Sequence, residues 1–351
     1  MSLVAAFRRQ AESCAGLGSP FTARLMEMLA DRLGPDHGAV AARLHAWPGD
    51  VGSSGASLPL RLAGGLHALV LGGHEGLRAV YPPERGPRWP AVSAAIREEE
   101  AFLLRWLDSP PQTNEVRRAA VIRAAGQWLA ERHGLPLELL ELGASAGLNL
   151  HWDRYGLLAG GQRFGPPEPA LTLEPEWRGP LPPAVEPRIA GRRGVDRAPL
   201  SPRRDALALR AYTWPDQPDR MRRLAAALAL PPAPVDRADA ADWLEGLPPQ
   251  AQGTTRMICH TIAWQYFPEA TAERARTAIE RMGERATDAT PLAWFGMEAD
   301  GNGDGAGLVL RLWPGDRRLD AGRCDFHGRW VEWRLAGDAA RASLRPEEEP
   351  T

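Results

Sequence analysis

The stretch from Leu139 to Leu150 constrains the fold more than any other part of this 351-residue chain. An apolar run ends in Glu141, a turn of small residues follows, and the next residues are compatible with a helix as far as about Tyr155. A strand, a tight glycine-containing turn and a helix start are typical of a βα unit. Such a turn lets backbone N–H groups approach a ligand, and the start of a helix favours anionic groups. We therefore expect a ligand site directly after this strand.

The segments after this turn alternate between strand and helix patterns. Strands are predicted at 189–195, 235–240, 256–260 and 291–298, and helices at 218–230, 241–247 and 269–285. Further strands are predicted close together at 307–313 and at 324–334, the latter with a turn at Gly328. Alternation of this kind predicts an α/β fold with a mostly parallel sheet and right-handed crossovers, and adjacent strands at the end predict an antiparallel edge.

The chain before the first strand has helical patterns throughout, so we expect an all-helical N-terminal domain. Domain boundaries are predicted as a helical cap over 1–110, an α/β domain over 111–345 and a disordered acidic tail over 346–351. A Pro-rich and Gly-rich segment at about 156–187 is interpreted as an insertion into the α/β domain. Within the helical part, Leu58 to Gly76 is predicted to be a buried helix with a small face at Gly64 and Gly65.

Composition excludes several classes of protein. The sequence contains no lysine, which excludes Schiff-base chemistry, Walker-type ATPases and Ser-Lys hydrolases. Its net charge of −2 gives no basic excess for a nucleic acid, and no apolar run approaches the length of a membrane span. Three widely spaced cysteines and an N-terminus without a signal-peptide pattern predict a cytoplasmic protein. Because the near-neutral charge disfavours a nucleic acid, we expect a small-molecule substrate.

Four short motifs, each at a predicted strand end, resemble those of class I S-adenosylmethionine-dependent methyltransferases. The first is Glu141-x-Gly143-x-x-x-Gly147, with Ser145 where these enzymes usually have a middle glycine. The other three, in chain order, are Gly194-Val195-Asp196, Asp239-Ala240 and His260. Ligands of open α/β sheets bind at the carboxyl ends of strands, which is where all four motifs are expected.

The resemblance implies a Rossmann-like methyltransferase sheet, S-adenosylmethionine as the cofactor and a role for each motif. The turn residues Gly143, Ala144, Ser145 and Gly147 would hold its methionine end, and Glu141 would bind its methionine or its ribose part. Asp196 would bind the ribose, and Asp239 with Ala240 would bind the adenine. His260 would act as a general base if the acceptor must lose a proton, with Gln265 and Tyr266 orienting the substrate.

Each of these residues also has a structural interpretation. Asp196 precedes a proline-containing turn, Asp239 is well placed to cap a helix, and His260 is equally compatible with a half-buried, hydrogen-bonded histidine. Glu141 and Asp196 are 55 positions apart (196 − 141), and the predicted insertion accounts for the length.

The whole chain also resembles a bacterial family, domain-of-unknown-function family 2332. The resemblance is carried by the segments 141–150 with 153–155, 176–179, 214–217, 260–266 and 111–115. It implies a methyltransferase-like fold and supplies no reaction.

Two other functions remain open from the sequence. Gly143 to Gly147 also spells G-x-S-x-G, the nucleophile elbow of α/β-hydrolases, with Ser145 as the nucleophile. In that case His260 or His327 would be the base, and Asp196 or Asp239 would be the acid. A non-catalytic nucleoside-binding protein with the same fold is the other alternative. No metal site is expected: Asp300 to Gly305 begins like a calcium loop, but its twelfth position is Arg311 instead of the required glutamate.

Overall fold

The computed structural model describes residues 1–83 and 86–337, so the predicted tail over 346–351 lies outside the described residues. The chain divides into two compact units. The first comprises residues 1–114 and 202–225, and the second comprises residues 115–201 and the chain from 226 onward. The sequence placed the domain boundary near residue 110 and assigned 202–225 to the α/β part of the chain.

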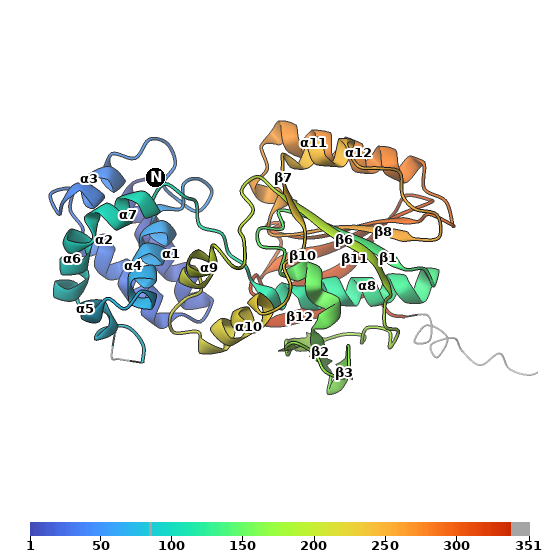
Figure 1. Cartoon of the computed structure of the whole chain (residues 1–351), viewed down its shortest axis with the longest axis horizontal. Coiled ribbons are helices and arrows are strands. Elements are labelled where there is room, and N and C mark those ends of the chain that lie inside the picture. The colour runs from blue at the N-terminus through green and yellow to red at the C-terminus, as the bar shows by residue number, and fades with distance from the viewer. Residues whose placement is uncertain (84–85, 338–351) are drawn as a thin grey trace, which may run out of the picture. The chain divides into compact units, whose positions relative to one another are not determined.

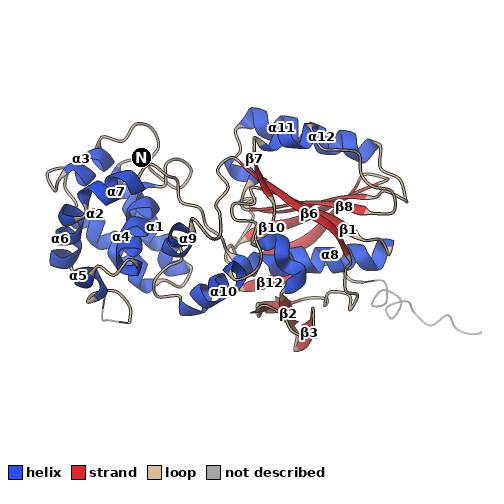
Figure 2. Ribbon diagram, in the orientation of Figure 1, coloured by secondary structure: helices blue, strands red, loops and turns tan. Residues whose placement is uncertain are grey.

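The first unit is helical in its described residues, as Figure 2 shows. Its helices are α1 (Leu3–Gly16), α2 (Pro20–Arg32), α3 (Ala39–His45), α4 (Leu58–Leu71), α5 (Glu75–Arg78), α6 (Trp89–Glu98), α7 (Glu100–Trp106), α9 (Ala206–Ala211) and most of α10 (Pro218–Leu228). The side chain of Ser19 caps α2 and Pro20 stands in its first turn, which is a favourable helix start.

The buried helix α4 organises this unit. A Cβ atom on Gly64 would lie 2.4 Å from the ring of Tyr212, and one on Gly65 would lie 2.8 Å from Leu103, so both positions require glycine. The predicted small face of this helix is thus confirmed. Asp216 ties residues 202–225 to the rest of the unit, because its carboxylate accepts hydrogen bonds from the Ser19 hydroxyl and the Phe21 N–H.

The second unit is built on a nine-stranded sheet with the order β5-β12-β11-β10-β9-β8-β1-β6-β7. Its strands are β1 (Leu137–Leu142), β5 (Glu176–Arg178), β6 (Ile189–Asp196), β7 (Val235–Arg237), β8 (Thr255–Thr261), β9 (Leu292–Glu298), β10 (Ala306–Trp313), β11 (Arg317–Cys324) and β12 (Trp330–Trp333). The five strands from β7 to β9 pair in parallel, and β9 to β12 pair antiparallel. The predicted mixed α/β fold with a mostly parallel sheet is confirmed.

Helices cover both faces of this sheet (Figure 1). On one face, α11 (Ala240–Glu245) and α12 (Glu269–Glu284) bury Leu140, Leu142 and Ile258. On the other face lies α8 (Ala119–His133), whose Gly126 approaches Leu137. Because successive side chains on a strand point to opposite faces, Glu141 lies on the α8 face. Near-continuous apolar runs such as β1 are expected of strands that are buried on both faces.

Three segments differ from the sequence prediction. The residues after the first turn form a 3-10 helix, η2 (Asn149–Arg154), which is kinked at His151, rather than an α-helix. The predicted insertion forms a small sheet of β2 (Gly156–Ala159), β3 (Gln162–Phe164) and β4 (Thr172–Leu173), but its β5 then joins the edge of the main sheet. Finally, β11 was missed, and the strand predicted at 324–334 is only β12.

No helix in the described part of the chain is both long enough and apolar enough to cross a membrane.

Candidate functional site

The candidate site lies at the carboxyl end of β1, at the point where the order of the parallel strands reverses. The chain proceeds from β1 outward to β6 and β7, and then returns to the opposite side of β1 as β8 and β9. Crevices at such switch points are where open α/β sheets bind ligands. The turn from Gly143 to Gly147 and the loop after β8 meet here, since a Cβ on Gly143 would lie 2.5 Å from the Cβ of Ala263.

The turn itself is closed by internal hydrogen bonds. The N–H groups of Gly143 and Ala144 both donate to the Val195 carbonyl, and that of Gly147 donates to the Ala144 carbonyl. The Ser145 N–H donates to the carboxylate of Asp196. The prediction that these four N–H groups are available to an anionic ligand is therefore wrong. With a short, kinked 3-10 helix behind the turn, the helix dipole that the prediction also used is missing.

Glu141 is the unusual residue of this site. Its side chain is buried, and its Oε2 atom has no hydrogen-bond partner within the described structure, while the side chain of Asn149 hydrogen-bonds the carboxyl group. Burial, followed by the nearby negative charge of Asp196, raises the pKa of Glu141 to about 8. At neutral pH this group is therefore largely a neutral carboxylic acid. A buried polar atom without a partner costs free energy, which a ligand that hydrogen-bonds it would recover.

Asp196 stands next to the turn at the end of β6. One carboxylate oxygen accepts the Ser145 N–H at 2.9 Å, and the other accepts the Ala198 N–H at 2.8 Å. The residue therefore fixes the turn, as its structural interpretation expected. Each carboxylate oxygen can accept a second hydrogen bond, so these contacts leave acceptor capacity for a ligand hydroxyl.

Asp239 caps α11. One of its oxygens accepts the Ala241 N–H at 2.9 Å, and the other accepts the Thr271 hydroxyl at 2.9 Å. Ala240, the first residue of this helix, is buried. The pair lies after β7, the edge strand, with β6 between that strand and β1.

The structure gives both ring nitrogens of His260, the predicted general base, a hydrogen-bond partner. Its Nδ1 lies 2.7 Å from the Glu298 carboxylate, and its Nε2 accepts the Trp294 indole N–H at 3.0 Å. Both ring nitrogens are thus engaged, and the ring is buried. Its neighbour Ile258 packs on the α12 face, so His260 points to the opposite face of the sheet from Glu141.

Glu298 was missed by the sequence prediction and organises the loop after β8. Its carboxylate accepts hydrogen bonds from His260 and from the backbone N–H groups of Ala263, Trp264 and Gln265. Although burial alone would raise its pKa, these donors hold the pKa of Glu298 below its ordinary value. The only sequence signal for this role was a glutamate at the end of a buried strand.

The loop that Glu298 fixes contains backbone strain and presents polar and aromatic side chains. Ile262 has φ = +51°, which is an outlier for a β-branched residue, and such strain is found where surrounding contacts enforce it. Beyond it, Gln265 is exposed and Tyr266 is 58% exposed. These two residues are therefore accessible to a substrate, as the sequence prediction requires, although they are separate from the buried His260.

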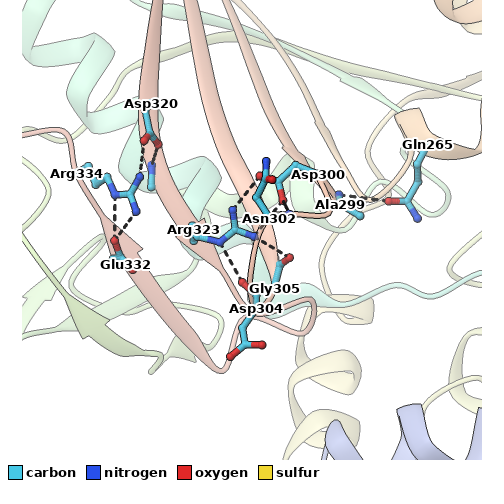
Figure 3. A network of polar contacts seen from close by, with 11 residues as sticks. Gln265, Ala299, Asp300, Asn302, Asp304, Gly305, Asp320, Arg323, Glu332 and Arg334 are labelled. Carbon is cyan, nitrogen blue, oxygen red and sulfur yellow. Dashed lines mark hydrogen bonds and ion pairs between the residues drawn. The ribbon is translucent and has the colours of Figure 1, made fainter.

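The predicted β-turn loop from Asp300 to Gly305 is held by an arginine (Figure 3). Arg323 donates to the carboxylate of Asp300 and to the carbonyls of Asp304 and Gly305. A guanidinium thus satisfies oxygens of this loop that a cation would otherwise contact. Among the described residues, no group of three or more His, Cys, Asp or Glu side chains is arranged to hold a metal ion.

The architecture is that of an α/β protein with a helical unit, and its candidate site lies at the switch point of a mostly parallel sheet. Residues 4–333 match the profile of DUF2332, which is described as an uncharacterized protein conserved in bacteria, and the chain belongs to this family. Neither a curated protein nor a solved structure matches the chain.

Proposed function

We propose that this protein is an S-adenosylmethionine-dependent methyltransferase that acts on a small-molecule acceptor. One observation carries the proposal: a buried glutamate, Glu141, has an oxygen without a partner at the switch point of a parallel sheet. When Glu141 is ionised, that oxygen requires a donor, and the ammonium group of an amino-acid moiety is such a donor. The arrangement of the five parallel strands, with the acid on the central one, supports the same proposal.

The residues around the turn fit the cofactor in part. Glu141 would hold the ammonium group, and Asp196 would use its remaining lone pairs for the ribose hydroxyls. Asp239 and Ala240 would border the adenine from the end of the neighbouring strand. The closed turn would contribute shape rather than N–H donors, because four of its N–H groups are already used. When bound, the cofactor supplies an electrophilic methyl group on a sulfonium.

The protein's remaining contribution to the reaction would be to position the acceptor against the methyl group. A displacement at a sulfonium methyl group depends on orientation and on exclusion of water, both of which a rigid site provides. Gln265 and Tyr266, on the loop that Glu298 holds, would orient the acceptor. If the acceptor loses a proton, His260 would accept it only after its Nε2 gives up the hydrogen bond from Trp294.

Isothermal titration with S-adenosylhomocysteine tests this function. We expect a Kd of about 1–100 µM for the wild type and a loss of at least about tenfold for Glu141→Gln. Glu284→Gln changes an exposed glutamate on α12 and is the matched control, which should bind like the wild type. Absence of binding up to about 5 mM ligand would overturn the proposal, since such affinity is below that of a specific site.

A serine hydrolase is the second candidate, and the backbone of Ser145 favours it. This residue has φ = +51° in a turn directly after a strand, and nucleophile elbows are also strained strand-ending turns. Against it, an elbow leads into an α-helix, and His260 is not available as the base. Labelling of Ser145 by a fluorophosphonate probe, together with no binding of S-adenosylhomocysteine, would favour the hydrolase.

A further inference from the structure

A polar groove lies at the opposite end of the sheet from the candidate site. It has a volume of about 600 Å³ and runs between the C-terminal parts of α11 and α12 and the segment that leads into β8. Three arginines line it, namely Arg256, Arg281 and Arg285. This volume is in the range of sites that bind small molecules.

The floor of the groove carries a buried cation with unused donor capacity. The side chain of Arg256 is 3% exposed, and it pairs through Nε and one terminal nitrogen with Glu138. The same terminal nitrogen also donates to the Pro248 carbonyl, and the other terminal nitrogen donates, within the described residues, only to the sulfur of Met282 at 3.5 Å. A thioether is a weak acceptor, so this nitrogen would gain from a charged oxygen.

The wall of the groove adds two exposed cations from the last turns of α12. Within the described residues, neither Arg281 nor Arg285 forms an ion pair, and Arg285 donates from Nε to the Arg281 carbonyl. Like charges at positions i and i+4 of a helix repel each other. The helix dipole explains why cations such as Arg281 and Arg285 are favourable near the C-terminal end of a helix. It does not explain Arg256, which belongs to β8 and lines the same groove.

The other charges around the groove leave this excess in place. Glu245, the carboxylate that lines the groove, is paired with Arg274, and Glu138 is paired with Arg256. The Gln250 amide donates to the carbonyls of Thr254 and Pro291 and so ties two segments near the groove together. Among the described lining residues, Arg281 and Arg285 are charges without an ion pair.

We propose that this groove is a binding site for a small oxyanion with at least two negative charges, such as a phosphorylated or polycarboxylate metabolite. Arg281 and Arg285 bind its outer charges, and the free donor of Arg256 binds the innermost oxygen. The site is separate from the one proposed for the methyl donor and does not depend on that function.

Titration with sodium pyrophosphate and with sodium citrate, at ionic strength held constant with sodium chloride, tests the proposal. We expect saturable binding of at least one probe with a Kd below about 1 mM. The double variant Arg281→Gln with Arg285→Gln should lose at least about tenfold in affinity, because two charge-assisted contacts are removed. A preference between the probes distinguishes a phosphoryl from a carboxylate ligand.

Arg276→Gln is the control for this experiment. Arg276 is on the same helix, is 49% exposed and pairs with Glu273 outside the groove. Its removal changes the net charge without changing the site, so binding should remain within about twofold of the wild type. Absence of binding up to about 10 mM probe would overturn the proposal. It would also be overturned if Arg276→Gln lost as much binding free energy as each of the two substitutions in the double variant. S-adenosylhomocysteine binding by the double variant should be unchanged, which keeps the two proposals distinguishable.

Discussion

Two glutamates, one buried and one partly buried, end parallel strands of the same sheet, yet their surroundings drive them to opposite protonation states. Glu298, at the end of β9, accepts hydrogen bonds from His260 and three backbone N–H groups, and its pKa is lowered. Glu141, at the end of β1, lies on the opposite face with an oxygen that has no partner, and its pKa is raised to about 8. The hydrogen bonds of Glu298 are satisfied within the protein, whereas Glu141 keeps one oxygen without a partner among the described residues. Groups whose surroundings separate their pKa values in this way commonly mark functional sites.

The largest effect is expected at Glu298. Glu298→Gln removes the charge and places an amide N–H₂ among four donors, which leaves buried N–H groups without acceptors. We expect a loss of about 2–4 kcal/mol in the free energy of unfolding at pH 7. Urea denaturation measures it, with Glu284→Gln as a control that should stay within about 0.5 kcal/mol of the wild type. An equally small change in Glu298→Gln would show that the carboxylate does not hold the loop.

Glu141→Gln should have the opposite sign. In the unfolded chain Glu141 loses its proton near the ordinary pKa of 4.5, whereas in the folded protein it keeps it to about pH 8. The folded state therefore binds more protons between these values, and the wild type loses stability as pH rises from about 4.5 to about 8. The glutamine variant lacks this loss, so it should be more stable by on the order of 2 kcal/mol at pH 8.

Urea denaturation of both proteins from pH 5 to pH 9 checks this prediction, since the difference should grow across that window and then level off. A variant that is destabilised by the same amount at every pH would mean that Glu141 is already satisfied in the folded protein.

A smaller effect is expected in the turn beside Glu141. Ser145 has φ = +51°, a conformation that glycine adopts without strain. Ser145→Gly should therefore raise the free energy of unfolding by up to about 1 kcal/mol, and it should leave binding of S-adenosylhomocysteine unchanged. Thermal denaturation and titration measure the two quantities. Loss of binding together with loss of stability would contradict this interpretation of the turn.

The smallest effect is expected at Asp300, two residues beyond Glu298. Hydrogen bonds from Arg323 lower the pKa of Asp300 to about 2, but Asp300 is exposed and Arg323 is only partly buried. Asp300→Asn should cost less than about 1 kcal/mol at pH 7 and less still at high salt. Calcium should not raise the melting temperature of the wild type, because Arg323 occupies the loop (Figure 3). Calcium-dependent stabilisation would show that the arginine is displaced.

The sequence predicted the elements whose patterns are local. The run in β1, the alternation of strands and helices, and the small face of α4 all depend on periodicity or on one close approach. The charged strand β11 was missed because the sheet is antiparallel at that point and several of its side chains face solvent. The segment 202–225 was assigned to the wrong part of the chain, because its anchoring through Asp216 is a contact over nearly 200 positions.

The candidate site was predictable in position but not in detail. The strand ends identified Glu141, Asp196 and Asp239, since strand ends of a parallel sheet share one edge. The face of the sheet to which each side chain points depends on the register of the strands. In this register His260 and Glu141 point to opposite faces. His260 and Glu298 are 38 positions apart and lie on two different strands, so no local sequence pattern predicts their hydrogen bond.

The most direct test of the central claim is proton-linked calorimetry of S-adenosylhomocysteine binding. If the ligand's ammonium group meets Glu141, this acid must ionise on binding and release up to about one proton at pH 7. Titrations in two buffers with different enthalpies of ionisation measure that proton, and Glu141→Gln should release none. Binding without proton release, or with equal release and affinity in Glu141→Gln, would contradict the account.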